Sequence, residues 1–325
     1  MACHWLRRAL LVLAPAAALF LAACGSGTIE SQFTPTRLVT FGDGMSDMGQ
    51  TSNDAVTNAR YTVNDNTVNV WVQQVAFDYG ILTNFIPAVS GGTAYATGNA
   101  RIAVQPDAAG NASTATVTKQ IDTFLATGSL TATDLPVLNG GTADIIAEMA
   151  KVQAGTETSD QMIANVKAAG TALGGQVRRL VQAGAPHVLV VGVYDLGKSP
   201  WATATGQAAL LSQASTQFND QLLLSIVDLG ANVLYVDAAL FFNLMVSSPG
   251  SYGVTDATTV VCTSLDPGAG IGIGTNQINS ARCTSSTIYN ALNYGVYAWA
   301  DFVYPTPTIH RQFGDYVYNR IRARW

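Results

Sequence analysis

The sequence contains few charged residues. Asp, Glu, Lys and Arg make up 11% of its 325 residues, whereas roughly 25% is typical of soluble domains. The formal net charge is −5, and no cluster of Lys and Arg occurs. Because nucleic-acid binding needs gathered positive charge, this pattern argues against nucleic acid as a partner.

Long apolar runs are missing except near the N-terminus. There, Arg7 and Arg8 precede an apolar run over residues 9–23. This run is shorter than the roughly 20 residues that a membrane-spanning helix needs. It has the length and flanks of a signal peptide, which we place at residues 1–23.

The run ends in Leu21-Ala22-Ala23-Cys24, which resembles the lipobox of bacterial lipoproteins. The resemblance implies export, cleavage before Cys24 and lipidation of that cysteine, with an ordinary secretory signal as the alternative. A tether over 24–35 and one domain over 36–325 would follow. No Asp follows Cys24, and in that family its absence favours the outer membrane, facing the periplasm or the cell surface.

Cysteine and histidine are scarce, at four and three residues. In an exported chain, Cys262 and Cys283 are expected to form a disulfide around a Gly-rich loop, and two free thiols are the alternative. No histidine lies near either cysteine, so we expect no metal and no other cofactor.

Short strand-like runs alternate with patterns typical of helices. The expected strands cover 37–41, 135–138, 188–193 and 233–236. Apolar residues recur at helical spacing over 162–180, 211–226 and 313–321. The alternation predicts an α/β fold, a three-layer α/β/α sandwich with a central parallel sheet and a site at the carboxyl ends of its strands.

Four segments at or near these strand ends carry recognisable motifs. They are Phe41-Gly42-Asp43-Gly44-Met45-Ser46-Asp47-Met48-Gly49, 91–101, Gly141-Thr142-Ala143-Asp144 and Asp301-Phe302-Val303-Tyr304-Pro305-Thr306. In this order they resemble the signature blocks of the GDSL, or SGNH, ester hydrolases. The resemblance spans nearly all of the chain after the signal peptide and implies the flavodoxin-like fold of that family.

The resemblance fails at the residues that carry the chemistry. In the family a serine attacks the ester, a histidine takes its proton and an aspartate orients the histidine. A glycine amide and an asparagine stabilise the oxyanion. Here Gly44 stands at the serine position, Ala143 at the asparagine position and Tyr304 at the histidine position. Gly98, at the oxyanion-hole position, and Asp301, at the acid position, are retained.

Two residues could replace the missing groups. Ser46, expected in the first turn of a following helix, is either a capping or packing serine or a shifted nucleophile. His310, expected in or near the last helix, is either structural or a substitute base. Glycine has no nucleophile, and tyrosine, with a pKa near 10, is a poor base at neutral pH.

Other residues of the blocks have structural explanations. Asp43 and Asp47 are expected to hold the first turn through nearby backbone N–H groups, and Asp144 is expected to be structural near the site. Several aromatic residues precede the last block, and they either pack in the core and a disulfide-linked flap or line a sugar or acyl site. They are Tyr289, Tyr294, Tyr297, Trp299 and Tyr304.

Two functions are consistent with this sequence. The first is a lipid-anchored pseudoenzyme that keeps the hydrolase cleft to bind an ester, acyl or glycan ligand. The second is an active ester hydrolase with a shifted catalytic set. No feature of the sequence predicts an oligomeric state.

Overall fold

The computed structural model describes residues 33–289 and 293–325. The predicted signal peptide at 1–23, the predicted lipidation site Cys24 and all but the end of the predicted tether at 24–35 lie outside the described residues. Among the residues that are described, no helix is both long and apolar enough to cross a membrane.

The centre of the molecule is a sheet of four parallel strands in the order β1-β2-β3-β4. The strands are β1 (Arg37–Phe41), β2 (Asp134–Leu138), β3 (Val188–Val191) and β4 (Val233–Val236). Every residue of β2 and β3 is buried, as expected for strands covered on both faces. All four strands were predicted from the sequence, although β3 ends two residues earlier.

A further segment extends the sheet at its β1 edge. The amide of Thr40 donates to the carbonyl of Thr93 at 3.0 Å, and the amide of Tyr95 donates to the carbonyl of Thr40 at 2.8 Å. Thr40 and Ala94 thus form an isolated parallel bridge. This bridge fixes where the chain enters the loop that carries Gly98.

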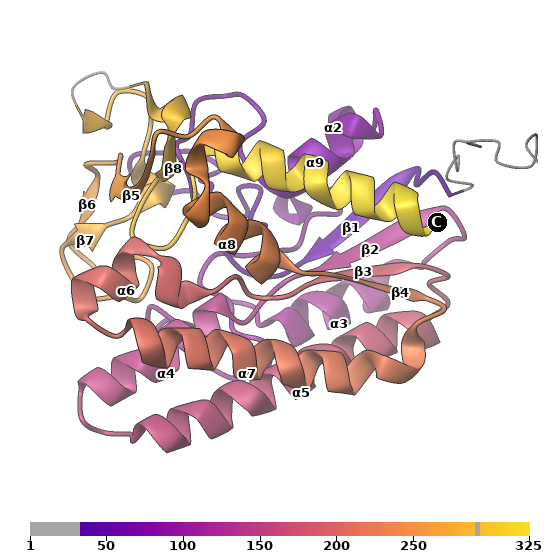
Figure 1. Cartoon of the computed structure of the whole chain (residues 1–325). Helices are drawn as coiled ribbons and strands as arrows, with labels where there is room; N and C mark the ends of the chain where they lie inside the picture. The colour runs from indigo at the N-terminus through magenta and orange to yellow at the C-terminus, as the bar shows by residue number, and fades with distance from the viewer. Residues whose placement is uncertain (1–32, 290–292) are drawn as a thin grey trace, which may run out of the picture.

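Helices cover both faces of the sheet (Figure 1). One layer holds α2 (Trp71–Asp78), α8 (Ala238–Ser247) and α9 (Pro307–Arg324). The other layer holds α3 (Val117–Thr127), α4 (Thr142–Gln153), α5 (Ser159–Gln182) and α7 (Ala208–Ile226). The fold is therefore a three-layer α/β/α sandwich with a parallel sheet, and the predicted fold class is confirmed.

The long helix α5 shows how the sequence sets these layers. Thr158 and Gln161 form a capping box at its start, which satisfies two backbone N–H groups. Along α5, Gly170 allows close contact with α7, because a Cβ there would lie 2.4 Å from the carbonyl oxygen of Phe218. The apolar residues that predicted this helix, Met162, Val166, Leu173, Val177 and Leu180, are fully buried.

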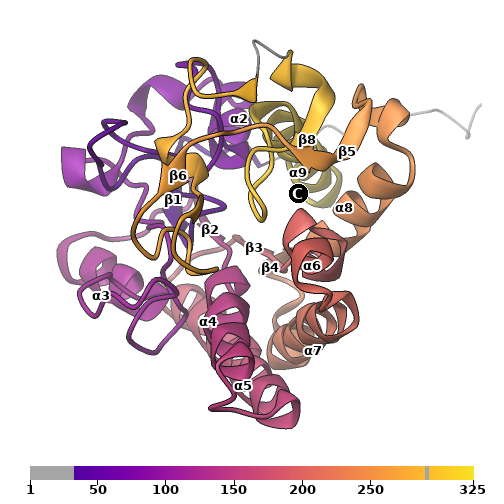
Figure 2. The same ribbon diagram turned by 90° about the vertical axis from the view of Figure 1, so that its left-hand side faces the viewer.

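Smaller elements gather beyond the carboxyl ends of the central strands (Figure 2). They are α6 (Pro200–Thr205), the parallel pair β5 (Asp256–Val260) and β8 (Tyr297–Trp299), and the antiparallel pair β6 (Leu265–Asp266) and β7 (Gln277–Ile278). Functional sites of parallel sheets lie at this end. These elements therefore cover the candidate site.

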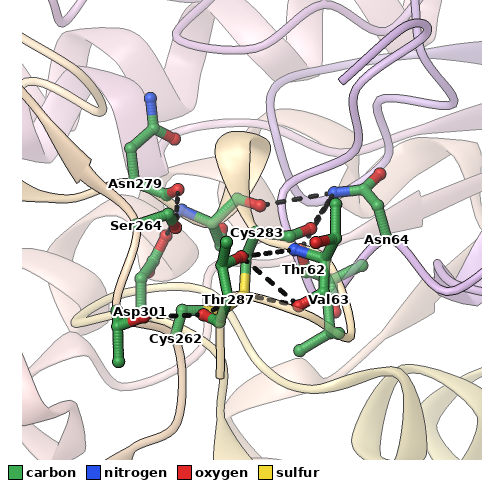
Figure 3. Close-up of a disulfide and its surroundings, with 12 residues drawn as sticks. Thr62, Val63, Asn64, Cys262, Ser264, Asn279, Cys283, Thr287 and Asp301 are labelled. Carbon is green, nitrogen blue, oxygen red and sulfur yellow. Dashed lines mark hydrogen bonds between the residues drawn. A yellow bond between two sulfur atoms is a disulfide. The ribbon is translucent and has the colours of Figure 1, made fainter. Parts of the chain in front are cut away.

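Cys262 and Cys283, the pair expected from the sequence, form a disulfide. It closes the loop that contains β6 and β7. The backbone amide and the side-chain amide of Asn64 both donate to the carbonyl of Cys283, at 2.9 and 3.0 Å (Figure 3). These two hydrogen bonds fasten the segment between β1 and α2 to the loop that the disulfide closes.

Candidate functional site

The four motif segments meet at the carboxyl end of the sheet, as the fold requires. Gly44 lies in the turn after β1, and Ala143 lies in the first turn of α4, which follows β2. Asp301 and Tyr304 lie between β8 and α9. Each of these residues is buried, so the open cleft that the sequence led us to expect is not found at these positions.

The aromatic ring of Tyr304 lies against Gly44, where a serine side chain would begin. A Cβ built on Gly44 would lie 2.6 Å from Tyr304 Oη, 2.8 Å from Tyr304 Cζ and 3.0 Å from Tyr61 Cγ. Real Cβ atoms essentially never come within 3.0 Å of a neighbouring atom. The site in its present form can therefore hold only glycine at position 44.

Tyr61 completes the aromatic filling of the site. Its ring centroid lies 5.0 Å from that of Tyr304, with an angle of 57° between the rings. A Cβ built on Gly98 would lie 1.9 Å from Tyr61 Oη. Tyr61 therefore covers the glycine whose amide would bind an oxyanion. Tyr61 was not predicted as a site residue, because no motif includes it and its role depends on the space left at Gly44.

The amide of Gly98 is already bonded. It donates to Asp47 Oδ2 at 2.7 Å. The other carboxylate oxygen, Asp47 Oδ1, accepts from the amides of Gly49 and Gln50, at 2.7 and 2.8 Å. Burial raises the pKa of Asp47 to about 6, although these three N–H donors oppose the shift. An internal carboxylate thus binds the amide that the family resemblance assigns to the oxyanion hole.

Asp43 performs a similar role at the start of α4. Its Oδ1 accepts from the amide of Met45 at 3.1 Å and from Asn139 Nδ2 at 2.7 Å. Burial raises the pKa of Asp43, and its hydrogen bonds together with the nearby amides of Ala143 and Thr142 partly offset this shift. The first residues of α4 thus face a protein carboxylate.

Asp301 holds its own turn rather than a histidine. Its Oδ1 accepts from the amides of Val303 and Tyr304, at 2.8 and 2.6 Å, and its Oδ2 accepts from the amide of Ser280 at 3.0 Å. Burial raises the pKa of Asp301, and these donors oppose the shift. The carboxylate therefore stabilises the backbone that presents Tyr304.

Ser46 and His310 do not form a catalytic pair. Ser46 lies in a hydrogen-bonded turn, not in a helix as expected. The carboxylates of Asp43 and Asp47 bind the backbone amides there, so the chain turns without starting a helix. The Oγ atom of Ser46 is buried and has no hydrogen-bond partner among the described residues.

His310 lies in α9 and is fully buried. Its Nδ1 accepts from the amide of Trp71 at 3.3 Å, at the first residue of α2. Burial lowers the pKa of His310 to about 3, so the ring is neutral at ordinary pH. This histidine therefore joins α2 to α9, and no activated serine lies against it in the described structure.

Asp144 links the second motif segment to α4. Its Oδ2 accepts from the amide of Ile102 at 3.0 Å, and its Oδ1 lies 3.4 Å from Arg101 Nε. Burial raises the pKa of Asp144 to about 6, and the nearby Arg101 guanidinium opposes the shift. Arg101 in turn binds Glu148, with 2.5 Å between Nη2 and Oε1.

The open space at this end of the sheet lies beside the rings of Tyr61 and Tyr304. A pocket that includes Met45 and Asn139 has a volume of only about 10 Å³, roughly enough for one water molecule. A cavity of about 620 Å³ lies between α6, α8 and β5, with Tyr289 and Phe302 in its wall. Trp299 and Tyr304 are core residues, whereas Tyr289 is 54% exposed. The described residues contain no cluster of three or more His, Cys, Asp or Glu suited to a metal ion.

Comparison with known proteins gives little further guidance. No family model matches the chain. A curated relative described as an uncharacterized protein in the trpE-trpG intergenic region of Pseudomonas putida is 26% identical over 162 residues. The matched region is 50% of this chain and 26% of the relative, so the match covers about a quarter of the relative's length.

Two solved structures share a similar arrangement of the chain. One is Est24, a carbohydrate acetylesterase from Sinorhizobium meliloti, with 12% identity, a TM-score of 0.45, and 89% of this chain and 99% of that chain covered. The other is the aryl esterase of M. smegmatis, with 14% identity, a TM-score of 0.44 and the same coverage. At these values we base no conclusion about activity on either likeness.

Replacing Gly44 by alanine tests the close fit against Tyr304. We expect Gly44→Ala to lower the free energy of unfolding by roughly 1–3 kcal/mol, the usual cost of overpacking. Tyr304→Phe removes the nearest atom, a buried hydroxyl without a partner. The cost of Gly44→Ala should therefore be smaller in that background, as measured by urea denaturation.

Gly175 provides the matched control, because a Cβ there meets nothing within 4 Å and the residue lies inside α5. Gly175→Ala should raise the free energy of unfolding by roughly 0.5–1 kcal/mol. If Gly44→Ala were as stable as the natural chain, or were stabilised as Gly175→Ala is, the close fit at Gly44 would be wrong.

His310 generates a prediction about pH. Its pKa is about 3 in the folded protein and about 6.5 when unfolded. The unfolded chain therefore binds a proton that the folded chain does not, and stability is lost as pH falls through this window. Glutamine does not titrate, so the cost of His310→Gln at pH 7 should shrink by roughly 2 kcal/mol at pH 5.

Urea denaturation of both proteins at the two pH values measures this difference. The shifted carboxyl groups of Asp47 and Asp144 are present in both proteins, so their contributions cancel. An equal cost of His310→Gln at pH 5 and pH 7 would mean that His310 takes up the proton in the folded protein. That result would contradict the complete burial of this histidine.

Proposed function

We propose that this chain is a catalytically inactive member of the SGNH ester hydrolase superfamily that is anchored to a bacterial envelope and acts by binding. The proposal rests on the observation that protein side chains fill the centre of the candidate site. Tyr304 and Tyr61 occupy the space beside Gly44 and Gly98, and Asp47 accepts the Gly98 amide at 2.7 Å. The nucleophile, the base and the oxyanion-binding amide are thus all unavailable.

The alternative, an active ester hydrolase with a shifted set, needs Ser46 to be activated. A serine nucleophile requires a base within hydrogen-bonding reach. Ser46 Oγ has no hydrogen-bond partner among the described residues, and the low pKa of His310 comes from its complete burial. Neither side chain is accessible to a substrate in this arrangement.

A ligand would have to bind outside the filled centre. The cavity of about 620 Å³ beside α6 combines the apolar walls of Ala204, Val246 and Phe302 with the exposed ring of Tyr289. Such a surface suits an acyl group or the apolar face of a sugar. We therefore propose that an acyl or glycan ligand binds there rather than at Gly44.

Catalysis can be tested with the full chain purified in detergent. We expect no labelling by a fluorophosphonate probe, because no activated serine is accessible. We also expect p-nitrophenyl acetate turnover equal to that of Ser46→Ala, while a family enzyme treated in parallel is labelled and active. Labelling at Ser46 that disappears on heat denaturation, or turnover that Ser46→Ala abolishes, would establish the alternative.

The proposed anchor is tested by metabolic labelling with an alkyne fatty acid in a bacterial host. The natural chain should be labelled and should sediment with membranes, since several acyl chains hold a protein firmly. Cys24→Ala should lose both properties. Cys3→Ala is the matched control and should keep them, because residue 3 belongs to the proposed signal peptide. Equal labelling of Cys24→Ala and the natural chain would refute lipidation at this residue.

A further inference from the structure

A second cavity lies on the side of the molecule, away from the filled centre. It has a volume of about 460 Å³ and lies between the loop that follows Arg101 and the helices α4 and α5. Its wall contains the charged residues Arg101, Asp144, Glu148 and Lys151, together with small apolar residues of the loop and of α5. Arg101 and Asp144 end two of the motif segments, but no motif assigned a ligand to this cavity.

The cavity contains a buried cation with an unused donor. The side chain of Arg101 is only 8% exposed. Its Nε faces Asp144 and its Nη2 binds Glu148, whereas its Nη1 has no hydrogen-bond partner among the described residues. Since Nη1 is not among the buried polar atoms that lack a partner, its N–H groups are open to the cavity that Arg101 lines.

The acidic groups of this cavity are already in use. Glu148 Oε1 accepts from Arg101 at 2.5 Å and from Lys151 at 2.9 Å, and Oε2 accepts from Lys151 at 2.9 Å and from Asn165 at 2.8 Å. Burial alone would raise the pKa of Glu148, but the contacts with Lys151, Glu157 and Asn165 and the charge of Arg101 lower it to about 2. The carboxylate is therefore ionised and saturated.

The polar groups of this cavity that remain available to a ligand are therefore hydrogen-bond donors. Arg101 Nη1 remains for a ligand, together with Lys151, whose side chain is 43% exposed and whose Nζ also lies 3.9 Å from Glu157 Oε1, beyond hydrogen-bonding distance. A ligand must therefore bring acceptor oxygens, and a carboxylate matches a guanidinium group best. Three carboxyl groups, those of Asp144, Glu148 and Glu157, face the two cations, so the attraction for an anion is small and the affinity is expected to be weak.

The remaining wall is apolar and made of small side chains. Ala103 and Val104 come from the loop, and Ala168, Ala169 and Ala172 come from α5. These residues offer methyl groups and room for a chain of a few carbons, without an aromatic surface. We propose that this cavity binds a short-chain aliphatic carboxylate, with its oxygens on Arg101 and Lys151 and its chain against the α5 alanines.

Sodium butyrate is the probe, titrated into the full chain in detergent and followed by calorimetry. We expect saturable binding with a Kd of about 1 mM, which is weak by protein–ligand standards. Butyramide has the same length without the charge and should bind at least tenfold more weakly. No saturation by butyrate well above the expected Kd, or equal binding of butyramide, would overturn the proposal.

Two variants locate the binding without removing the buried Arg101. Ala168→Leu narrows the cavity, and Lys151→Met removes one donor, so each should weaken butyrate binding at least tenfold. Ala209→Leu changes an exposed alanine of α7 that lies outside the cavity and should bind butyrate like the natural chain. Equal binding by all three variants would place the butyrate elsewhere and refute the site.

Discussion

The buried carboxylate of Asp47 is the constraint on which this end of the molecule depends. It joins two segments that are far apart in sequence, because it binds the amides of its own turn and the amide of Gly98. A carboxylate in a buried site must be paired or hydrogen-bonded to be tolerated. Three N–H donors meet this requirement. One of them is the amide of Gly98, which the family resemblance assigns to the oxyanion hole.

The substitutions at the centre depend on one another. Gly44 leaves the space that the Tyr304 ring takes, and Tyr61 then packs on Tyr304 and over Gly98. A serine at position 44 and a tyrosine at position 304 cannot coexist in this arrangement. Gly44 and Tyr304 therefore belong to a single packing arrangement, in which aromatic side chains fill the space beside Gly44 and Gly98.

The sequence predicted the parts of the structure that follow from local patterns. The four central strands, the apolar face of α5 and the pairing of Cys262 with Cys283 were all visible in periodicity or composition. The turn at Ser46 was not, because two aspartate side chains stop a helix there. Tyr61 was missed for a related reason, since its position depends on contacts with residues from three separate segments.

The site is closed, and the amide of Gly98 is bonded to Asp47. Amide hydrogen exchange of Gly98, followed by NMR at neutral pH, tests this claim most directly. The account predicts that this amide exchanges as slowly as the amides of β1 and β2, because it is buried and bonded to Asp47. Exchange as fast as that of an exposed loop amide would show that the site opens readily and would contradict the account.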